Sequence, residues 1–349
     1  MNMVDILKNA VEKGASDIHI ATDTKPMARI TGDIVALDFP ELTSEDIDKA
    51  IKEIIPESMN EKFDQGDEID CGFSIKDVAR FRVNIYQEKK GWAIAFRAIS
   101  DKIPSVEDIG IQESIINLTK IPKGLILVTG PTGSGKSTLI ACLIDLINRE
   151  RKSHIITMED PIEYLFEDRS CIVSQREIGN HSGSFANALK YALRQDPDIV
   201  LVGEMRDLET ISMALTMAET GHLVFATLHT TDAAQTVDRI IDVFPAFQQQ
   251  QVRMQLSGSL RAVISQELLP NIEGTGRVAA REVMIVNSAI ANLIREGQTH
   301  QIYSAIQTGK GVGMQSMDNA LADLCRDGLI TYEAAEAKSN NPDALKAYL

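Results

Sequence analysis

The chain has 349 residues and a formal net charge of −15 at pH 7. Hydrophobic residues make up 44% and charged residues 24% of it, as in ordinary globular proteins, so two or three domains with sizeable cores are expected. The acidic balance argues against a general nucleic-acid-binding protein, because such proteins usually carry a basic surface.

Cysteine content and hydropathy indicate a cytoplasmic protein. The four cysteines form no C-x-x-C pair, so neither a zinc site nor a disulfide framework is predicted, and the thiols are expected to be reduced and mostly buried. The first residues, MNMVDILKNAVEKGASD, lack the uninterrupted apolar core of a signal peptide. No window approaches the roughly 18 apolar residues of a transmembrane helix, so any membrane role is expected to go through a partner.

The first hundred residues predict a small α+β domain. Apolar residues at helical spacing predict a helix over 4–13, and Thr43 with Asp46 forms a capping-box signature for a second helix over 42–55. Strand patterns fall in the segments 16–23, 27–38 and 67–99. The stretch 101–117 has little periodicity and is predicted to be a linker or hinge.

From about residue 118 onward, apolar strand patterns alternate with helical patterns. The strand patterns are GLILVTG (124–130), SHIITMED (153–160), PDIVLVG (197–203) and HLVFATLHT (222–230). This alternation is typical of a parallel sheet whose strands are joined by crossover helices. The last stretch, from about 287 to 349, is predicted to be mainly helical.

One motif stands between a strand pattern and a helix pattern. Residues 130–137, GPTGSGKS, satisfy G-x-x-x-x-G-K-[ST] completely. The glycines let backbone N–H groups turn toward phosphate oxygens, and the start of the helix adds its positive end. Lys136 is expected to reach the β- and γ-phosphates, and the Ser137 hydroxyl is expected to hold Mg²⁺. The predicted nucleotide-binding residues are Gly130, Pro131, Thr132, Gly133, Ser134, Gly135, Lys136, Ser137 and Thr138.

Acidic residues follow two of the predicted strands. Glu204 comes just after the apolar run 199–202, at the strand end where ligands bind in open α/β sheets. It is expected to polarise water or to bind Mg²⁺ through a water, and a solvated loop glutamate is the alternative. Glu159, Asp160 and Glu163 follow the other strand, where their mutual repulsion favours a nearby metal–triphosphate, an ordinary acidic loop being the alternative.

Two histidines flank the apolar strand pattern 223–228. His229 stands at its carboxyl end, where a neutral imidazole could donate a hydrogen bond to the γ-phosphate and sense its loss, while His222 precedes the strand. A hydrogen-bonded structural role is the alternative for both.

These four elements, in this order, resemble the boxes of the secretion ATPase superfamily, the hexameric motors of type II secretion and type IV pili. GPTGSGKST resembles the Walker A loop, ITMEDPIEY the Asp box, IVLVGEMRD the Walker B segment and HLVFATLHTTDA the His box. The resemblance covers nearly the whole chain. It implies an α/β fold, in which an N-terminal PAS-like domain (1–100) precedes a RecA-like P-loop ATPase domain with a parallel-sheet core (118–349). It also implies Mg²⁺-dependent ATP hydrolysis.

Within the superfamily, the chain resembles the type IV pilus retraction ATPases. NLIREGQTHQIYSAIQTG (292–309) is similar to a segment characteristic of them, although it reads LIREG where they have AIRAG. The assembly ATPases carry a longer N-terminal region and a tetracysteine metal site, whereas 268–283 contains no cysteine. The expected function is therefore ATP-driven pilus retraction and twitching motility. A pilus-assembly or type II secretion ATPase is the alternative.

The resemblance also implies roles for residues that spacing alone could not assign. Glu204 would be the catalytic glutamate, Glu159 and Glu163 would serve the metal and the water, and His222 and His229 would form the His-box pair.

The same resemblance implies roles for two arginines and identifies the expected partners. Arg82 and Arg97, from the N-terminal domain, would reach the phosphates across an interface, although Arg97 also fits a strand-edge surface charge. The partners would be further copies in a homo-hexamer and the inner-membrane platform protein of the pilus machine, without direct nucleic-acid binding. The protein would thus lie in the cytoplasm, peripheral to the inner membrane.

The segment 292–302 is expected to couple the ring to the platform protein, and an ordinary amphipathic helix is the alternative.

Two other functional classes remain open at this point: a nucleotide-gated binding module and a DNA-translocating motor. Lys136 and Glu204 argue against the first, and the acidic balance argues against the second.

Overall fold

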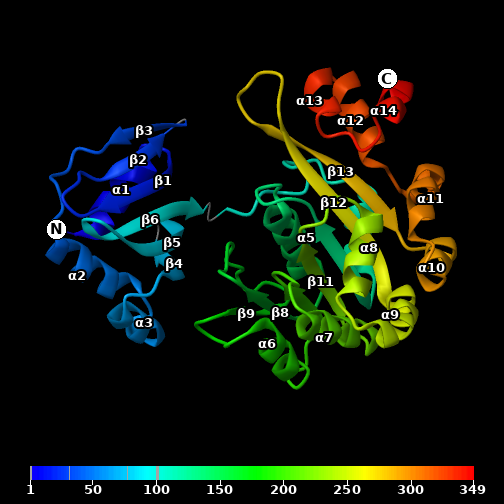
Figure 1. Cartoon of the computed structure of the whole chain (residues 1–349), viewed down its shortest axis with the longest axis horizontal. Coiled ribbons are helices and arrows are strands. Elements are labelled where there is room, and N and C mark those ends of the chain that lie inside the picture. Colours follow the sequence, from blue (N-terminus) through cyan, green and yellow to red (C-terminus); the bar gives the residue numbers. More distant parts are fainter. Residues whose placement is uncertain (1, 31, 77, 100–101) are drawn as a thin grey trace. The chain divides into compact units, whose positions relative to one another are not determined.

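The computed structural model describes residues 2–30, 32–76, 78–99 and 102–349. The chain forms two compact units (Figure 1). The first unit runs to Lys102 and also contains Asp160–Leu165 and Glu177–Gly183; the second contains Ile103–Glu159, Phe166–Arg176 and Ser184–Leu349.

The first unit is built on an antiparallel sheet of six strands in the order β3-β2-β1-β6-β5-β4. The strands are β1 (Ala15–Ala21), β2 (Met27–Ile30), β3 (Asp33–Ala36), β4 (Ile69–Ile75), β5 (Ala79–Glu88) and β6 (Gly91–Ile99). The helices are α1 (Met3–Glu12), α2 (Ser44–Ile54), the short 3₁₀ helix η1 (Glu57–Met59) and α3 (Asn60–Gln65). The capping box predicted for α2 is present, since Thr43 and Asp46 exchange hydrogen bonds.

Alternation along the strands separates core from surface in this unit. In β5, Phe81, Val83 and Ile85 are buried, while Arg82 between them is exposed. The buried side chains of β1, β5 and β6 join those of α1 and α2 in one hydrophobic core.

The second unit contains a seven-stranded sheet in the order β13-β12-β7-β11-β10-β8-β9. Its strands are β7 (Gly124–Thr129), β8 (His154–Glu159), β9 (Ile172–Glu177), β10 (Ile199–Val202), β11 (Leu223–Leu228), β12 (Leu260–Pro270) and β13 (Arg277–Ile285). In the sheet order β8-β10-β11-β7-β12, each strand pairs in parallel with the next. Strand β13 pairs antiparallel with β12. All residues of β7, β10 and β11 are buried, as expected for central strands covered on both faces.

Helices connect and cover these strands. They are α4 (Glu113–Ile116), η2 (Asn117–Lys120), α5 (Lys136–Glu150), α6 (Phe185–Ala192), α7 (Leu208–Glu219), α8 (Ala233–Asp242), α9 (Ala246–Ser259), α10 (Ser288–Arg295), η3 (Thr299–Gln301), α11 (Ile302–Thr308), η4 (Lys310–Val312), α12 (Met317–Arg326), α13 (Tyr332–Glu336) and α14 (Pro342–Tyr348). The predicted α/β fold with a parallel core and a helical C-terminal region is confirmed (Figure 1). The hairpin β12–β13 was not predicted.

Residues just after Lys102 belong structurally to the second unit. Ile103, Val106 and Ile109 pack against its hydrophobic core. Arg281 of β13 donates hydrogen bonds to the carbonyl oxygens of Ile109 and Gly110, at 2.8 and 2.7 Å. The segment 103–117 is therefore held on the second unit, residue 101 of the predicted linker lies outside the described residues, and the role of the linker as a hinge stays a prediction.

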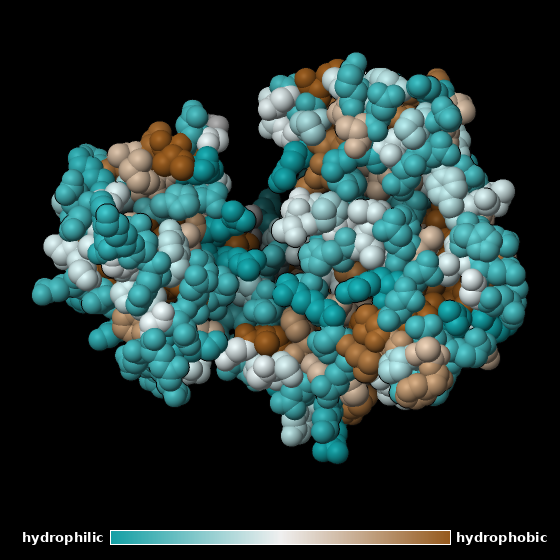
Figure 2. All heavy atoms as spheres, viewed as in Figure 1, coloured by the Kyte–Doolittle hydropathy of each residue, from teal (hydrophilic) through white to brown (hydrophobic). Residues whose placement is uncertain are grey.

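The surface drawn in Figure 2 is mostly hydrophilic, with smaller apolar areas. Within the described part of the chain, none of the helices combines the length and the apolar character needed to span a bilayer. The four cysteines are free thiols, and three of them, Cys71, Cys142 and Cys171, are buried.

Asp318 ties the C-terminal helices together. Its buried carboxylate accepts hydrogen bonds from the hydroxyls of Tyr303 (2.8 Å) and Ser339 (2.6 Å), and from the backbone amides of Asn340 (2.9 Å) and Asn341 (3.1 Å). Asp318→Ala should lower the free energy of unfolding by about 3 kcal/mol, because several donors would lose a buried acceptor. Thermal unfolding followed by circular dichroism measures this change.

Asp343→Ala is the matched control, since Asp343 is an exposed acid in the first turn of α14. Equal melting temperatures for the two variants would contradict the anchoring role of Asp318.

Candidate nucleotide-binding site

The loop between β7 and α5 has a backbone that requires glycine. Gly130, Gly133 and Gly135 have φ values of 136°, 79° and 82°, in the left-handed region that side chains disfavour. A Cβ at Gly130 would clash with the backbone carbonyl of Gln266, and one at Gly135 would lie 2.9 Å from the Gln266 side-chain nitrogen. The strand–loop–helix context predicted for the phosphate-binding motif is thus present.

Polar groups of this loop are arranged to receive an anion. Lys136 Nζ donates hydrogen bonds to the carbonyl oxygens of Gly130 (2.7 Å) and Pro131 (3.0 Å), across the loop. Ser134 Oγ is buried and has no hydrogen-bond partner among the described residues. Thr132, Gly133 and Ser137 are exposed, so a phosphate could approach the loop amides and the start of α5.

Side chains of β12 and β13 hydrogen-bond to the phosphate loop or to one another and so hold the loop in place. The sequence motifs did not predict these contacts. Gln266 Nε2 donates a hydrogen bond to the Ser134 carbonyl at 2.6 Å, and Arg281 Nε donates to Gln266 Oε1 at 2.7 Å. Gln266 and Arg281 are both buried. Burial lowers the pKa of Arg281 to about 10, which still leaves it a cation at neutral pH.

Glu204 and His229 meet at the carboxyl ends of neighbouring parallel strands. Glu204 follows β10 and His229 follows β11, and His229 Nε2 lies 2.9 Å from Glu204 Oε1. Arg206 Nε contacts the same oxygen at 2.6 Å. Both predicted residues therefore stand at the expected edge of the sheet, and Arg206 is a third member that the motifs alone did not single out.

The environment of Glu204 keeps its carboxylate ionised. Burial raises its pKa, but the hydrogen bond from Arg206, together with the nearby charges of His229 and Arg206, outweighs burial and lowers the pKa below its ordinary value. A carboxylate held by two donors has a defined orientation, as a group that positions a water must have.

Glu159 is the last residue of β8. Thr157 Oγ1 donates to its Oε1 at 2.6 Å, and Gln175 Nε2 contacts the same atom at 3.3 Å. Because β8 pairs in parallel with β10, Glu159 ends its strand on the same edge of the sheet as Glu204. Glu163, by contrast, lies on Asp160–Leu165, within the first unit.

His222 occupies the opposite end of β11 from His229. Its Nδ1 lies 2.9 Å from the Met217 carbonyl oxygen and 3.3 Å from Thr220 Oγ1, at the C-terminus of α7. The six residues of β11 span about 20 Å, so the two histidines do not meet within one chain. The hydrogen bonds of His222 fit the structural alternative.

Arg82 and Arg97 lie in the first unit, directly opposite each other on β5 and β6. Arg97 Nε donates to Asp17 Oδ1 at 2.8 Å, and its side chain is 72% exposed. Burial raises the pKa of Asp17, but the hydrogen bonds from Arg97 and Ser16 and the charge of Arg97 lower it overall. An exposed arginine pair can meet an anion, and this role stays a prediction.

Arg206 is a positioning residue for Glu204 by this geometry. Arg206→Ala should reduce kcat for ATP hydrolysis about tenfold, because Glu204 loses its shortest contact. It should also move the acidic limb of the kcat–pH profile to higher pH, since loss of the Arg206 hydrogen bond and charge raises the pKa of Glu204. Steady-state rates between about pH 4 and pH 8 measure both effects, because the acidic limb of the wild type lies below the ordinary pKa of a glutamate.

Arg194→Ala provides the control, because Arg194 is an exposed arginine of the same unit. A fall in kcat without movement of the pH profile would count against positioning through Glu204.

Loop, helix N-terminus and strand-end carboxylates together define a P-loop nucleoside triphosphatase. Residues 2–323 match the family of type II/IV secretion system proteins, and the chain belongs to that family. The resemblance inferred from the four boxes is thereby confirmed.

Two relatives and one solved structure are similar to this chain over nearly its whole length. It is 48% identical to the type IV pilus retraction ATPase PilT of Pseudomonas aeruginosa, over 98% of this chain and 99% of that protein. It is 37% identical to the type IV pilus ATPase PilU of the same organism, over 99% and 91%. A crystal structure of the pilus retraction motor PilT with bound ADP matches with a TM-score of 0.92 and 48% identity, covering 99% of each chain.

Proposed function

We propose that this protein is an ATPase that drives type IV pilus retraction. The observation that carries the proposal is the complete phosphate loop at the same edge of the parallel sheet as Glu204, in a chain 48% identical to a retraction ATPase over nearly its full length. The PilT match with bound ADP supports adenine nucleotides as the ligand. The lower identity to PilU makes PilT the better guide to the activity.

The loop residues would bind and orient the phosphates. Backbone N–H groups of 130–138 and the N-terminus of α5 would face the phosphate oxygens. Lys136 would exchange the carbonyls of Gly130 and Pro131 for the β- and γ-phosphates. The buried hydroxyl of Ser134, which lacks a partner, supports a ligand at this loop.

The exposed hydroxyl of Ser137 fits a Mg²⁺ ligand, with Glu204 near the metal through a water. Bound there, the metal would neutralise charge on the phosphate oxygens. Glu204 would orient the attacking water and accept its proton, held in place by Arg206 and His229. Glu159 and Glu163 would assist with metal and water, and His222 would keep its structural hydrogen bonds at α7.

Arg82 and Arg97 would stabilise the developing charge on the transferred phosphoryl group. Family membership supports a homo-hexamer, and a ring of this kind would be built from heterologous interfaces that close by rotation. It would act at the inner membrane through the platform protein of the pilus machine.

Exposed residues around η3 are the proposed coupling surface. Ile294 and Ile302 are buried, whereas Glu296 and His300 are exposed. Replacing both exposed residues by alanine should leave ATPase activity within about twofold, because neither contacts the nucleotide loop, while pilus retraction should be lost. Twitching assays and ATPase rates of the same variant measure the two properties.

Glu273→Ala, at the exposed turn of the β12–β13 hairpin, is the control. Loss of ATPase activity together with retraction would contradict a separate coupling surface.

Deletion of the gene in its own host tests whether the motor retracts pili or assembles them. Cells that retain pili but do not retract them are expected. Bald cells would instead identify a pilus-assembly ATPase.

A further inference from the structure

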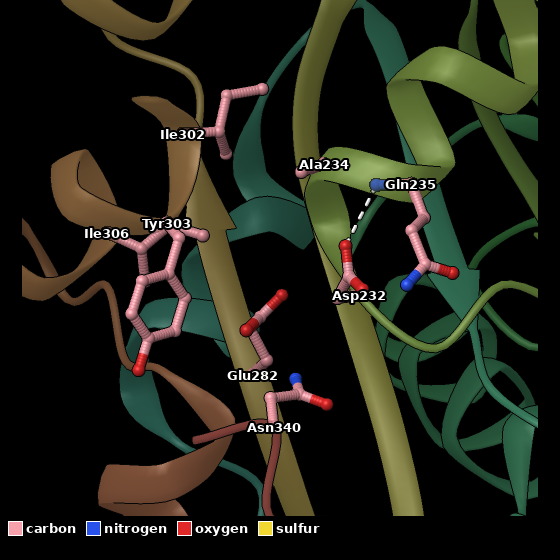
Figure 3. A pocket seen from close by; sticks show the side chains of 8 residues that line it. All are labelled: Asp232, Ala234, Gln235, Glu282, Ile302, Tyr303, Ile306 and Asn340. Atoms are coloured by element: carbon pink, nitrogen blue, oxygen red, sulfur yellow. Dashed lines mark hydrogen bonds between the residues drawn. The ribbon is translucent and has the colours of Figure 1, made fainter. Parts of the chain in front are cut away.

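Glu282 is a buried glutamate of the second unit whose role is structural. It comes from β13 and lines a small pocket between the start of α8 and helix α11 (Figure 3). Its carboxylate accepts hydrogen bonds from the backbone amides of Ala233 and Met317. The Tyr303 hydroxyl, which lines the same pocket, donates to Asp318. Both side chains are therefore engaged within the chain, where they tie the surrounding helices to β13.

Glu177 of the first unit also holds chain segments together, and one of these segments carries a residue of the proposed mechanism. Its buried carboxylate pairs with Arg80 of β5, with Arg80 Nη2 lying 2.9 Å from Glu177 Oε2. The same oxygen accepts a hydrogen bond from the Ile162 amide at 3.1 Å, and Arg80 Nε donates to the Ile162 carbonyl oxygen at 2.7 Å. The Arg80–Glu177 pair thus binds both polar backbone atoms of Ile162.

Ile162 directly precedes Glu163, so the pair acts on the backbone of that glutamate. The carbonyl of Ile162 and the amide nitrogen of Glu163 belong to one planar peptide group. A guanidinium that fixes this carbonyl therefore fixes where the Glu163 backbone begins. The Glu163 side chain is half-buried and has no hydrogen-bond or ion-pair partner among the described residues. The position of its carboxylate thus depends on the backbone that Arg80 holds.

Gly72 of β4 leaves the space that the pair occupies. A Cβ at this position would lie 2.5 Å from Arg80 Nη2 and 3.0 Å from Glu177 Oε2. Gly72 does not have a positive φ, so the backbone conformation does not require glycine here. The close approach of the guanidinium to the strand explains the missing side chain instead.

The pair lies on the face of the antiparallel sheet that carries the two predicted phosphate arginines. Residues two apart on a strand share a face, so Arg80 and Arg82 stand on one side of the sheet, and Arg97 lies directly opposite Arg82 on β6. Arg80 holds the segment Asp160–Leu165 from this side. The first unit therefore carries Glu163 together with both predicted arginines.

We propose that Arg80 is a positioning residue for ATP hydrolysis, which sets the place of the Glu163 carboxylate through its pair with Glu177 and its bond to the Ile162 carbonyl. The inference rests on the role proposed for Glu163 in serving the metal and the water. A displacement of about 1 Å in a group of this kind can cost up to about a hundredfold in rate, so loss of Arg80 should act on kcat. It should leave KM within about twofold, because the hydrogen bonds of Arg80 go to residues of the first unit and not to the phosphate loop.

A double-mutant cycle tests the proposal. Arg80→Met, which keeps an unbranched apolar stem but no donors, is made in the wild-type protein and in a Glu163→Gln background. It should lower kcat about tenfold in the wild-type protein. In the Glu163→Gln background it should lower kcat less than about twofold, because the glutamate that Arg80 positions is already lost.

Arg29→Met is the control for loss of an arginine from the same sheet. Arg29 of β2 also donates to a backbone carbonyl, that of Gly32, at 2.6 Å. Because this bond lies within the β2–β3 turn, Arg29→Met should leave kcat unchanged in both backgrounds. Circular dichroism checks that every variant is folded.

Should Arg80→Met fail to fold, because Glu177 is then a buried charge without its partner, Gly72→Ala decides. This change keeps both charges and shifts only the ends of the Arg80 and Glu177 side chains. It should lower kcat about fivefold in the wild-type protein and should have no further effect in the Glu163→Gln background. Gly183→Ala is its control, since a Cβ there would meet nothing within 4 Å. An unchanged kcat in Gly72→Ala would then overturn the proposal.

Equal losses of kcat from Arg80→Met in both backgrounds would overturn the proposal, because Arg80 would then act by a route other than Glu163. A rise in KM that accounts for the whole loss would overturn it as well. Glu163→Gln with the wild-type kcat would refute the role of Glu163 and the inference with it. Failure of the proposed retraction function would differ from all of these, since the cycle would still hold for ATP hydrolysis while twitching would not depend on the protein.

Discussion

Lys136→Ala should reduce ATP hydrolysis at least a hundredfold and should weaken ATP binding. Lys136 Nζ now bridges the carbonyl oxygens of Gly130 and Pro131, so it is already held over the loop in which the phosphates would lie. Its removal deletes the one cation that the loop itself directs at the β- and γ-phosphates. Steady-state phosphate release and titration with a fluorescent ATP analogue measure the two losses.

Lys190→Ala is the matched control for charge and size, since Lys190 is exposed on α6. Circular dichroism should show both variants folded. If Lys136→Ala hydrolysed ATP at more than a tenth of the wild-type rate, the loop would not be the catalytic phosphate site.

Glu204→Gln should lower kcat by two to three orders of magnitude while ATP still binds. The amide keeps the size of the side chain and its oxygen can still accept from Arg206 and His229, but it cannot accept a proton from water. Loss of a group that acts in the transition state lowers kcat without a matching rise in KM. Single-turnover hydrolysis and equilibrium ATP binding, measured on one preparation, separate these effects.

Glu209→Gln, an exposed glutamate in the first turn of the neighbouring helix α7, is the control for the loss of one negative charge. A parallel loss of binding and turnover in Glu204→Gln would point to a role in holding the nucleotide.

Stimulation of wild-type turnover by DNA would favour the translocase alternative, and absence of turnover under every condition would favour a binding module.

Local sequence patterns were sufficient for the phosphate loop and for Glu204. The loop motif lies within eight consecutive residues, and Glu204 directly follows an apolar run that forms a buried parallel strand. In both cases the strand fixes where the next residues stand, so position along the chain determines position in space. The capping box of α2 was predictable for the same reason.

Contacts between distant segments were not predictable in this way. Gln266 supports Ser134 from 132 residues away, and no local pattern links a polar residue in β12 to a loop after β7. The β12–β13 hairpin that carries Gln266 and Arg281 was itself missed. Arg206 stood in a segment already singled out for Glu204, and a positive charge two residues from a catalytic acid is the signal that could have identified it.

The histidines show how one local pattern can lead to two different environments. His222 and His229 flank the same strand, yet β11 separates them, and only His229 reaches Glu204. The strand pattern already placed the two histidines at opposite ends of a parallel strand, and the pairing of the two was implied only by the family resemblance.

The central claim is that cleavage of ATP by this chain drives retraction. Complementation of the gene deletion with Glu204→Gln is its most direct test. Pili per cell and twitching distance are compared for strains that carry wild-type protein or Glu204→Gln at matched expression. Wild-type protein should restore retraction, and the Glu204→Gln strain should stay heavily piliated and non-motile. Normal twitching in the Glu204→Gln strain would contradict the account.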